Sequence, residues 1–132
     1  MFTSRKLKKI KNFIIENGGG TLNAKTLKNA DYLRGYMVSL AGYEKQLKIE
    51  NLTIKTIKLY QKNAQRLHAN VGFWLENNIL FLDISKHFTS KDKAVRTALK
   101  NNQIALYDIY NAKSVYLKDI KAKRVQAVRY TF

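Results

Sequence analysis

The chain has 132 residues, of which 25 are Lys or Arg and 9 are Asp or Glu, giving a formal net charge of +16. Apolar residues make up 45% of it, which provides for a packed core and excludes a disordered polybasic tail. The absence of Cys excludes disulfides and thiolate metal sites. Because a compact protein with this charge repels itself, the surplus indicates an anionic partner.

The first predicted element is a basic helix over residues 4–16, with Ser4 as its N-cap. Its apolar residues at helical spacing are Leu7, Ile10, Phe13 and Ile14. We expect the glycine run 18–20 to form the helix C-cap and a turn. It does not match a phosphate-binding loop, because it follows a helix and no Gly-Lys-Ser/Thr comes after it.

A weak strand or extended arm is predicted over residues 21–28 and a clearer strand over 36–40, between Gly35 and Gly42. A short strand is predicted at 47–49. No apolar run approaches the length of a bilayer span, and no apolar region follows the basic N-terminal residues. We therefore expect neither a membrane partner nor a signal peptide.

The second predicted helix covers residues 53–68. Its inward-facing residues are Ile54, Ile57, Tyr60, Ala64 and Leu67. Its basic residues at steps of three and four are Lys55, Lys58, Lys62 and Arg66. This spacing aligns the four cations in one stripe about three turns long.

The clearest local pattern is a hairpin over residues 71–84, with Asn77-Asn78 at its turn. A two-residue turn places Trp74 opposite Phe81. One face is then wholly apolar and must belong to the core. Its residues are Val71, Phe73, Leu75, Leu80, Leu82 and Ile84.

A third helix is predicted from a cap at Thr89, with Asp92 as its capping-box partner, to about Asn101. Its inward-facing residues are Ala94, Val95, Ala98 and Leu99, and its outer cations are Lys93, Arg96 and Lys100. A last hairpin is predicted from strands 104–110 and 114–117. The basic residues after 117 fit either a strand or a helix.

These elements predict the α+β class: a single domain with a mainly antiparallel sheet built of hairpins and about three helices. Within residues 1–132 we expect a basic N-terminal helix (1–17), a central α+β unit (33–118) and a basic C-terminal extension (119–132).

The segments 35–40, 72–85 and 94–108 resemble a loose group of small proteins from phages, plasmids and integrative elements of Gram-positive bacteria. The resemblance covers roughly residues 33–118 and supplies no functional residues. It implies a mobile-element context, in which small proteins often bind nucleic acid or neutralise a host defence such as restriction or CRISPR.

Charge and context together lead us to expect a non-enzymatic protein that binds DNA, RNA or a ribonucleoprotein in the cytoplasm of a bacterial host. The expected binding residues are Lys8, Lys9, Lys55, Lys58, Lys62, Arg66, Lys93, Arg96, Lys100, Lys121, Lys123 and Arg124. Trp74 and Phe81, or Tyr107 and Tyr110, offer stacking surfaces for bases if a sheet face exposes them.

Two alternatives stay open. The protein can instead inhibit a host defence system, as anti-CRISPR or anti-restriction proteins do, by binding the nuclease or its guide RNA or DNA-binding surface. The basic surface can also be a solvated face that reflects an AT-rich genome, with the aromatic residues buried beneath helices.

Catalysis finds little support in the sequence, and we expect no enzyme, no cofactor and no metal. Asp83, Ser85 and His87 alternate along one strand, but neighbours two apart are too widely spaced to hydrogen-bond readily in line. Asp83 and Asp108 provide two carboxylates for a metal-dependent nuclease, without an evident third carboxylate or a suitably spaced lysine.

Overall fold

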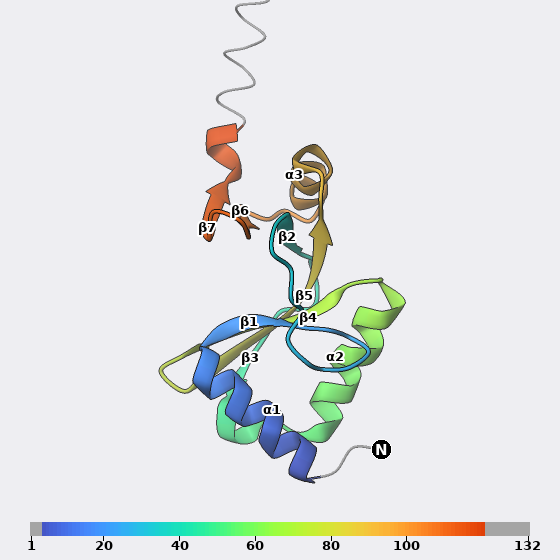
Figure 1. Ribbon diagram of the computed structural model, residues 1–132, viewed down its shortest axis with the longest axis vertical. Coiled ribbons are helices and arrows are strands. Elements are labelled where there is room, and N and C mark those ends of the chain that lie inside the picture. Colours follow the sequence, from blue (N-terminus) through green and yellow to red (C-terminus); the bar gives the residue numbers. More distant parts are fainter. Residues whose placement is uncertain (1–3, 121–132) are drawn as a thin grey trace, which may run out of the picture. The chain divides into compact units, whose positions relative to one another are not determined.

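The computed structural model describes residues 4–120, which divide into two compact units that are interleaved in sequence (Figure 1). Unit 1 comprises Met1–Asp31 and Gly42–Lys86, and unit 2 comprises Tyr32–Ala41 and His87–Phe132. The basic N-terminal helix, expected outside the central unit, thus belongs to unit 1 together with residues 42–86. That all 132 residues form one domain stays a prediction.

Helices and antiparallel strands together confirm the α+β class. The helices are α1 (Ser4–Asn17), the 3-10 turn η1 (Ile49–Asn51), α2 (Ile54–Arg66) and α3 (Lys91–Lys100). The strands are β1 (Gly19–Leu22), β2 (Tyr36–Ser39), β3 (Lys45–Lys48), β4 (Asn70–Glu76), β5 (Ile79–Phe88), β6 (Ala105–Asp108) and β7 (Lys113–Tyr116). No helix in the described part of the chain is long and apolar enough to cross a membrane.

The β4–β5 hairpin has the predicted register and is the centre of unit 1. Trp74 lies opposite Phe81, and Glu76 lies opposite Ile79 on either side of the turn. Asn77 and Asn78 both have positive φ, 50° and 63°, as a two-residue turn of this twist requires. β1 pairs with β4, and β3 pairs with β5, so the four strands form one antiparallel layer.

One face of this layer is the core of unit 1, as the apolar pattern predicted. Val71, Phe73, Leu80, Leu82 and Ile84 are all buried. α1 covers this face, because the Phe13 ring meets the Phe73 ring edge-on at a centroid distance of 5.7 Å. α2 lies on the same side of the strands (Figure 1). The other side of the layer is called the open face below.

Unit 2 repeats this arrangement with β2, β6 and β7 as its sheet. β6 pairs with both β2 and β7, and α3 packs against the face that carries Leu106. The buried core residues are Val38, Ala94, Val95, Ala98, Leu106 and Leu117. The three predicted helices and the final hairpin are therefore confirmed within a few residues of their expected ends.

Four local predictions were wrong: the glycine run, the extent of the strand after it, the cap of the third helix and the strand at Ile49. Only Gly18 has the left-handed conformation of a C-cap (φ +70°), while Gly19 and Gly20 belong to β1. β1 ends at Leu22 because the Asn23 side chain accepts hydrogen bonds from the N–H groups of residues 25 and 26 and turns the chain.

The other errors concern helix starts. Ser90, not Thr89, caps α3, since its hydroxyl accepts the N–H of Lys93 at 3.3 Å. Asp92 is thus one residue short of the capping-box position. Ile49, expected in a strand, starts the 3-10 turn η1.

Candidate nucleic-acid interface

The cationic stripe of α2 is formed as the spacing predicted. Thr53 caps the helix by accepting the N–H of Thr56 at 3.2 Å, and Ile57 and Ala64 are buried on its inner side. The four outer residues are exposed, and we call them the cationic α2 face: Lys55, Lys58, Lys62 and Arg66.

Arg66 is held in place at the end of this face. Its guanidinium donates to the Tyr43 hydroxyl at 3.0 Å and to Oδ1 of Asn63 at 3.4 Å. The Tyr60 hydroxyl, six residues earlier on α2, donates to the Tyr43 carbonyl oxygen. These contacts fix the C-terminal end of α2 to the segment before β3 and orient one cation of the face.

The other helices also expose their predicted cations. On α1, Lys8 and Lys9 are exposed while Ile10 and Ile14 are buried. On α3, the predicted cations Lys93, Arg96 and Lys100 are exposed opposite a buried alanine-rich side. The predicted residues Lys121, Lys123 and Arg124 lie outside the described residues.

Trp74 is the most prominent side chain of the open face in unit 1, with 57% of its surface exposed. It lies opposite Gly19 of β1, and a Cβ built on Gly19 would be 2.5 Å from Cε3 of the indole. The indole therefore occupies the space that a side chain on β1 would take. Phe81, its partner on β5, is half-buried.

Unit 2 exposes tyrosines on the sheet face that points away from α3. Tyr107 of β6 and Tyr116 of β7 are 43% and 49% exposed, and Tyr110 in the connecting turn is 77% exposed. Ser114 lies directly opposite Tyr107. Tyr116, two residues further along β7, is therefore the diagonal neighbour of Tyr107, about 7–8 Å away between backbones.

Sequence reasoning named Tyr107 and Tyr110 but missed Tyr116. The signal that identifies Tyr116 is the register of the last hairpin, and this register depends on the length of the loop between the two strands. We expected residues 111–113 as the turn, whereas the strands end at Asp108 and resume at Lys113.

In unit 1 the predicted binding residues divide between two opposite sides. The cations of α1 and α2 belong to the helix layer, and Trp74 and Phe81 belong to the open face. The structure therefore brings the cations of each helix together and pairs the two aromatic residues, but it separates the two groups. One extended strand of nucleic acid cannot contact both without wrapping around an edge of the unit.

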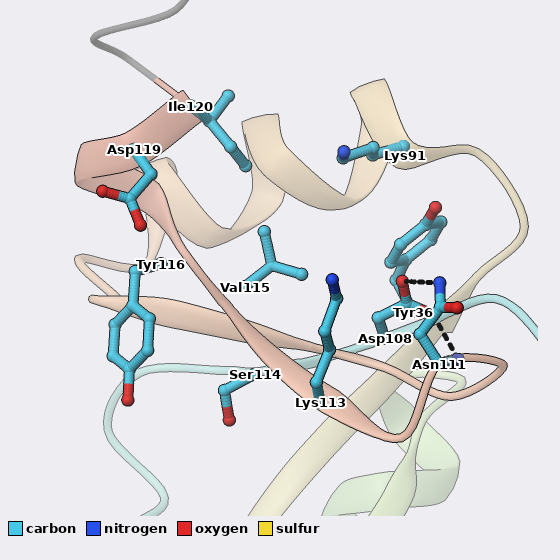
Figure 2. A pocket seen from close by; sticks show the side chains of 10 residues that line it. All are labelled: Tyr36, Lys91, Asp108, Asn111, Lys113, Ser114, Val115, Tyr116, Asp119 and Ile120. Atoms are coloured by element: carbon cyan, nitrogen blue, oxygen red, sulfur yellow. Dashed lines mark hydrogen bonds between the residues drawn. The ribbon is translucent and has the colours of Figure 1, made fainter.

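A pocket of about 610 Å³ lies in unit 2 between the start of α3 and the β6–β7 hairpin (Figure 2). Asp108 is buried at its wall and accepts two hydrogen bonds from Asn111, at 2.8 Å from Nδ2 and 3.2 Å from the backbone N–H. These bonds, and then the charges of Lys113 and Lys91, hold the pKa of Asp108 below its usual range. Asp108 thus stabilises the hairpin turn.

Asp83 and Ser85 are closer than their strand spacing predicted. The Ser85 hydroxyl donates to Oδ1 of Asp83 at 2.7 Å, so the expectation that neighbours two apart do not readily bond was wrong for this pair. The reason is Gly72, the cross-strand partner of Asp83, which has no side chain to hold the two apart.

His87 makes contacts of its own in unit 2. Its Nε2 lies 2.8 Å from the Arg34 carbonyl oxygen, and its ring stacks on Tyr32 at a centroid distance of 3.8 Å. Nε2 must carry a proton to donate to that oxygen. These contacts hold the segment around Gly35 against His87. A Cβ built on Gly35 would lie 2.4 Å from Nε2 of His87.

The two candidate metal carboxylates belong to different units, Asp83 to unit 1 and Asp108 to unit 2. Among residues 4–120 there is no group of three or more His, Cys, Asp or Glu residues arranged to hold a metal ion.

Comparison of the chain with protein-family models, curated proteins and solved structures finds no match. A function therefore has to be inferred from the surfaces themselves.

Proposed function

We propose that this protein binds nucleic acid, alone or within a ribonucleoprotein, through the cationic surfaces of its helices and without catalysing a reaction. The observation that carries the proposal is the cationic α2 face, four exposed cations in line on a helix whose other side is buried. From Lys55 to Arg66 the face is roughly 16 Å long, over which one strand of B-DNA carries about five phosphates.

The wider charge distribution supports the same proposal. α1 and α3 also expose cations on the sides that point away from their cores. The chain carries a net charge of +16, so association with a polyanion releases many counterions. The mobile-element context and the cytoplasm of a bacterial host are part of this proposal, and both come from the resemblance over residues 33–118.

Salt-dependent binding of labelled DNA and RNA, followed by fluorescence anisotropy, tests the proposal. We expect affinity to fall steeply as salt rises, and each lysine that contacts a phosphate of a duplex contributes about −0.9 to the logarithmic slope. Replacing Lys55, Lys58 and Lys62 by Glu should weaken binding at least about tenfold and flatten the slope by up to about three.

A matched control separates the cationic α2 face from total charge. Lys25, Lys28 and Lys45 are exposed lysines of the same unit outside α2, and their replacement by Glu changes the net charge equally. Equal losses in both triple variants would show that the α2 face is not the interface. An absence of binding to every nucleic acid at low salt would refute the proposal.

A second function, inhibition of a host defence nuclease of the CRISPR or restriction type, is favoured by the exposed tyrosines of unit 2. Tyr107, Tyr110 and Tyr116 lie on one hairpin, and tyrosine is enriched at the energetic centres of protein interfaces. This function predicts a stable complex with the nuclease and its guide, weak binding of bare nucleic acid, and loss of the complex when Tyr107 and Tyr116 become Ala.

A further inference from the structure

We infer that the open face of unit 1 stacks unpaired nucleobases on Trp74, so that single-stranded nucleic acid gains a contact that a duplex cannot make. The inference rests on the proposed function and names its substrate class. A base that stacks needs an aromatic ring with one free side, a support that holds the ring, and polar groups for the base edges.

Gly19 provides the support. A Cβ on this residue would lie 2.5 Å from Cε3 and 2.8 Å from Cζ3 of Trp74, so the six-membered ring of the indole lies over the β1 backbone. Trp74 nevertheless has 57% of its surface exposed. One side of the indole therefore rests on the sheet, and a large part remains accessible to a ligand.

The surroundings of Trp74 are polar, which favours bases over an apolar protein surface. The strand register places Thr21, Gln46, Lys48, Glu76 and Asp83 on the open face with Trp74 and Phe81. A protein interface core is normally depleted of charged residues. Nucleobases instead combine an apolar ring face with hydrogen-bonding edges, and a face of this composition can satisfy both.

Lys48 provides a cation for the backbone of such a ligand. Lys48 lies on edge strand β3 opposite Ile79, which makes it a diagonal neighbour of Phe81. It is exposed. A single strand with a base on Trp74 and a phosphate at Lys48 meets this cation, whereas a duplex keeps its base faces inside the stack.

Trp74 is the only tryptophan in the chain, so intrinsic fluorescence reports on this position alone. The test titrates the full chain with a ten-nucleotide oligothymidylate, with oligouridylate and with a mixed-sequence duplex at one salt concentration. We expect the single strands to quench the fluorescence and the duplex to leave it unchanged. Quenching by the duplex to the same extent would overturn the inference.

Substitutions at Trp74 give a second measurement by anisotropy. Trp74→Ala should weaken binding of the single strands by roughly five- to a hundredfold, while duplex affinity stays within about twofold. Trp74→Phe keeps a ring and should retain most of the single-strand affinity. Ile15→Ala is the control, because Ile15 is an equally exposed apolar residue (57%) on the helix side of unit 1.

The outcomes distinguish the two proposals. Salt-sensitive binding without quenching, with Trp74→Ala within twofold of the wild type, would overturn the stacking site and leave cationic binding in place. No binding to any probe would overturn both. If the Lys55, Lys58 and Lys62 triple variant still shows full quenching at saturation with single strands, the open face binds bases independently of α2, as we infer.

Discussion

The Ser85 hydroxyl donates a 2.7 Å hydrogen bond to Oδ1 of Asp83, two residues earlier on β5. The contact depends on the bare backbone of Gly72 on the neighbouring strand. A Cβ on Gly72 would lie 2.0 Å from Asp83 Oδ1 and 2.8 Å from Ser85 Oγ. Ser85 is itself buried, so the pair leaves its hydroxyl satisfied.

Gly72→Ala should therefore lower the free energy of unfolding by about 1–3 kcal/mol, because the new methyl group overpacks the space that both side chains fill. Urea denaturation measures the change. In an Asp83→Ala background the same substitution should cost less, since the closest clashing atom is gone. Strictly additive costs in the double-mutant cycle would contradict this role of Gly72.

Gly19→Ala should move the Trp74 indole without much loss of stability. The indole is exposed and can swing outward, so we expect a cost below about 1 kcal/mol together with a shift of the emission maximum. Gly20→Ala is the contrasting control, because its Cβ would lie 3.1 Å from Cζ of the buried Phe73. That variant should lose stability while the tryptophan emission stays the same.

Tyr60→Phe should destabilise unit 1 by about 1 kcal/mol, since it removes the hydrogen bond to the Tyr43 carbonyl. Burial raises the pKa of Tyr60, and the carboxylates of Asp83 and Glu44 add to this. The neutral hydroxyl thus stabilises the fold below the ordinary tyrosine pKa, and this contribution is lost as pH rises through the folded pKa.

Alkaline unfolding monitored by circular dichroism tests this sign. The difference in stability between wild type and Tyr60→Phe should shrink as the pH rises above about 10. Tyr107→Phe, at an exposed tyrosine, should behave as the wild type does. A difference that grows with pH would show that the Tyr60 environment is described incorrectly.

Asp108→Asn should lower the melting temperature by a few degrees at neutral pH. Hydrogen bonds from Asn111, then Lys113 and Lys91, lower the pKa of Asp108, so its carboxylate stabilises the folded state above the ordinary aspartate pKa. This contribution is lost as pH falls through the lowered folded pKa. Thermal melts at descending pH should show the two proteins converging.

Asp119→Asn is the matched control for that experiment, since Asp119 is an exposed carboxylate on the same pocket (Figure 2). It should change the melting temperature at neutral pH less than Asp108→Asn does. A gap between wild type and Asp108→Asn that persists at the lowest pH would mean that the carboxylate charge is not what stabilises the turn.

The sequence by itself determined the helices, the hairpins and the cationic α2 face. These features depend on periodicity and on short-range turn chemistry: Asn77-Asn78 sets the β4–β5 register, and steps of three and four align Lys55, Lys58 and Lys62. Burial follows from the same pattern, because a one-residue slip would expose Leu80 and Leu82.

Only the tertiary structure decided which long-range partners meet. Gly18–Gly20 has the composition of a turn, yet Gly19 and Gly20 form a strand because β4 lies beside them and their missing side chains admit Trp74 and Phe73. Long-range packing also places Trp74 on the side of the sheet opposite the helix cations, because strand pairing and helix docking fix which side of the sheet is covered. Neither is encoded in a local period, so the open face appears only once the strands of unit 1 are assembled.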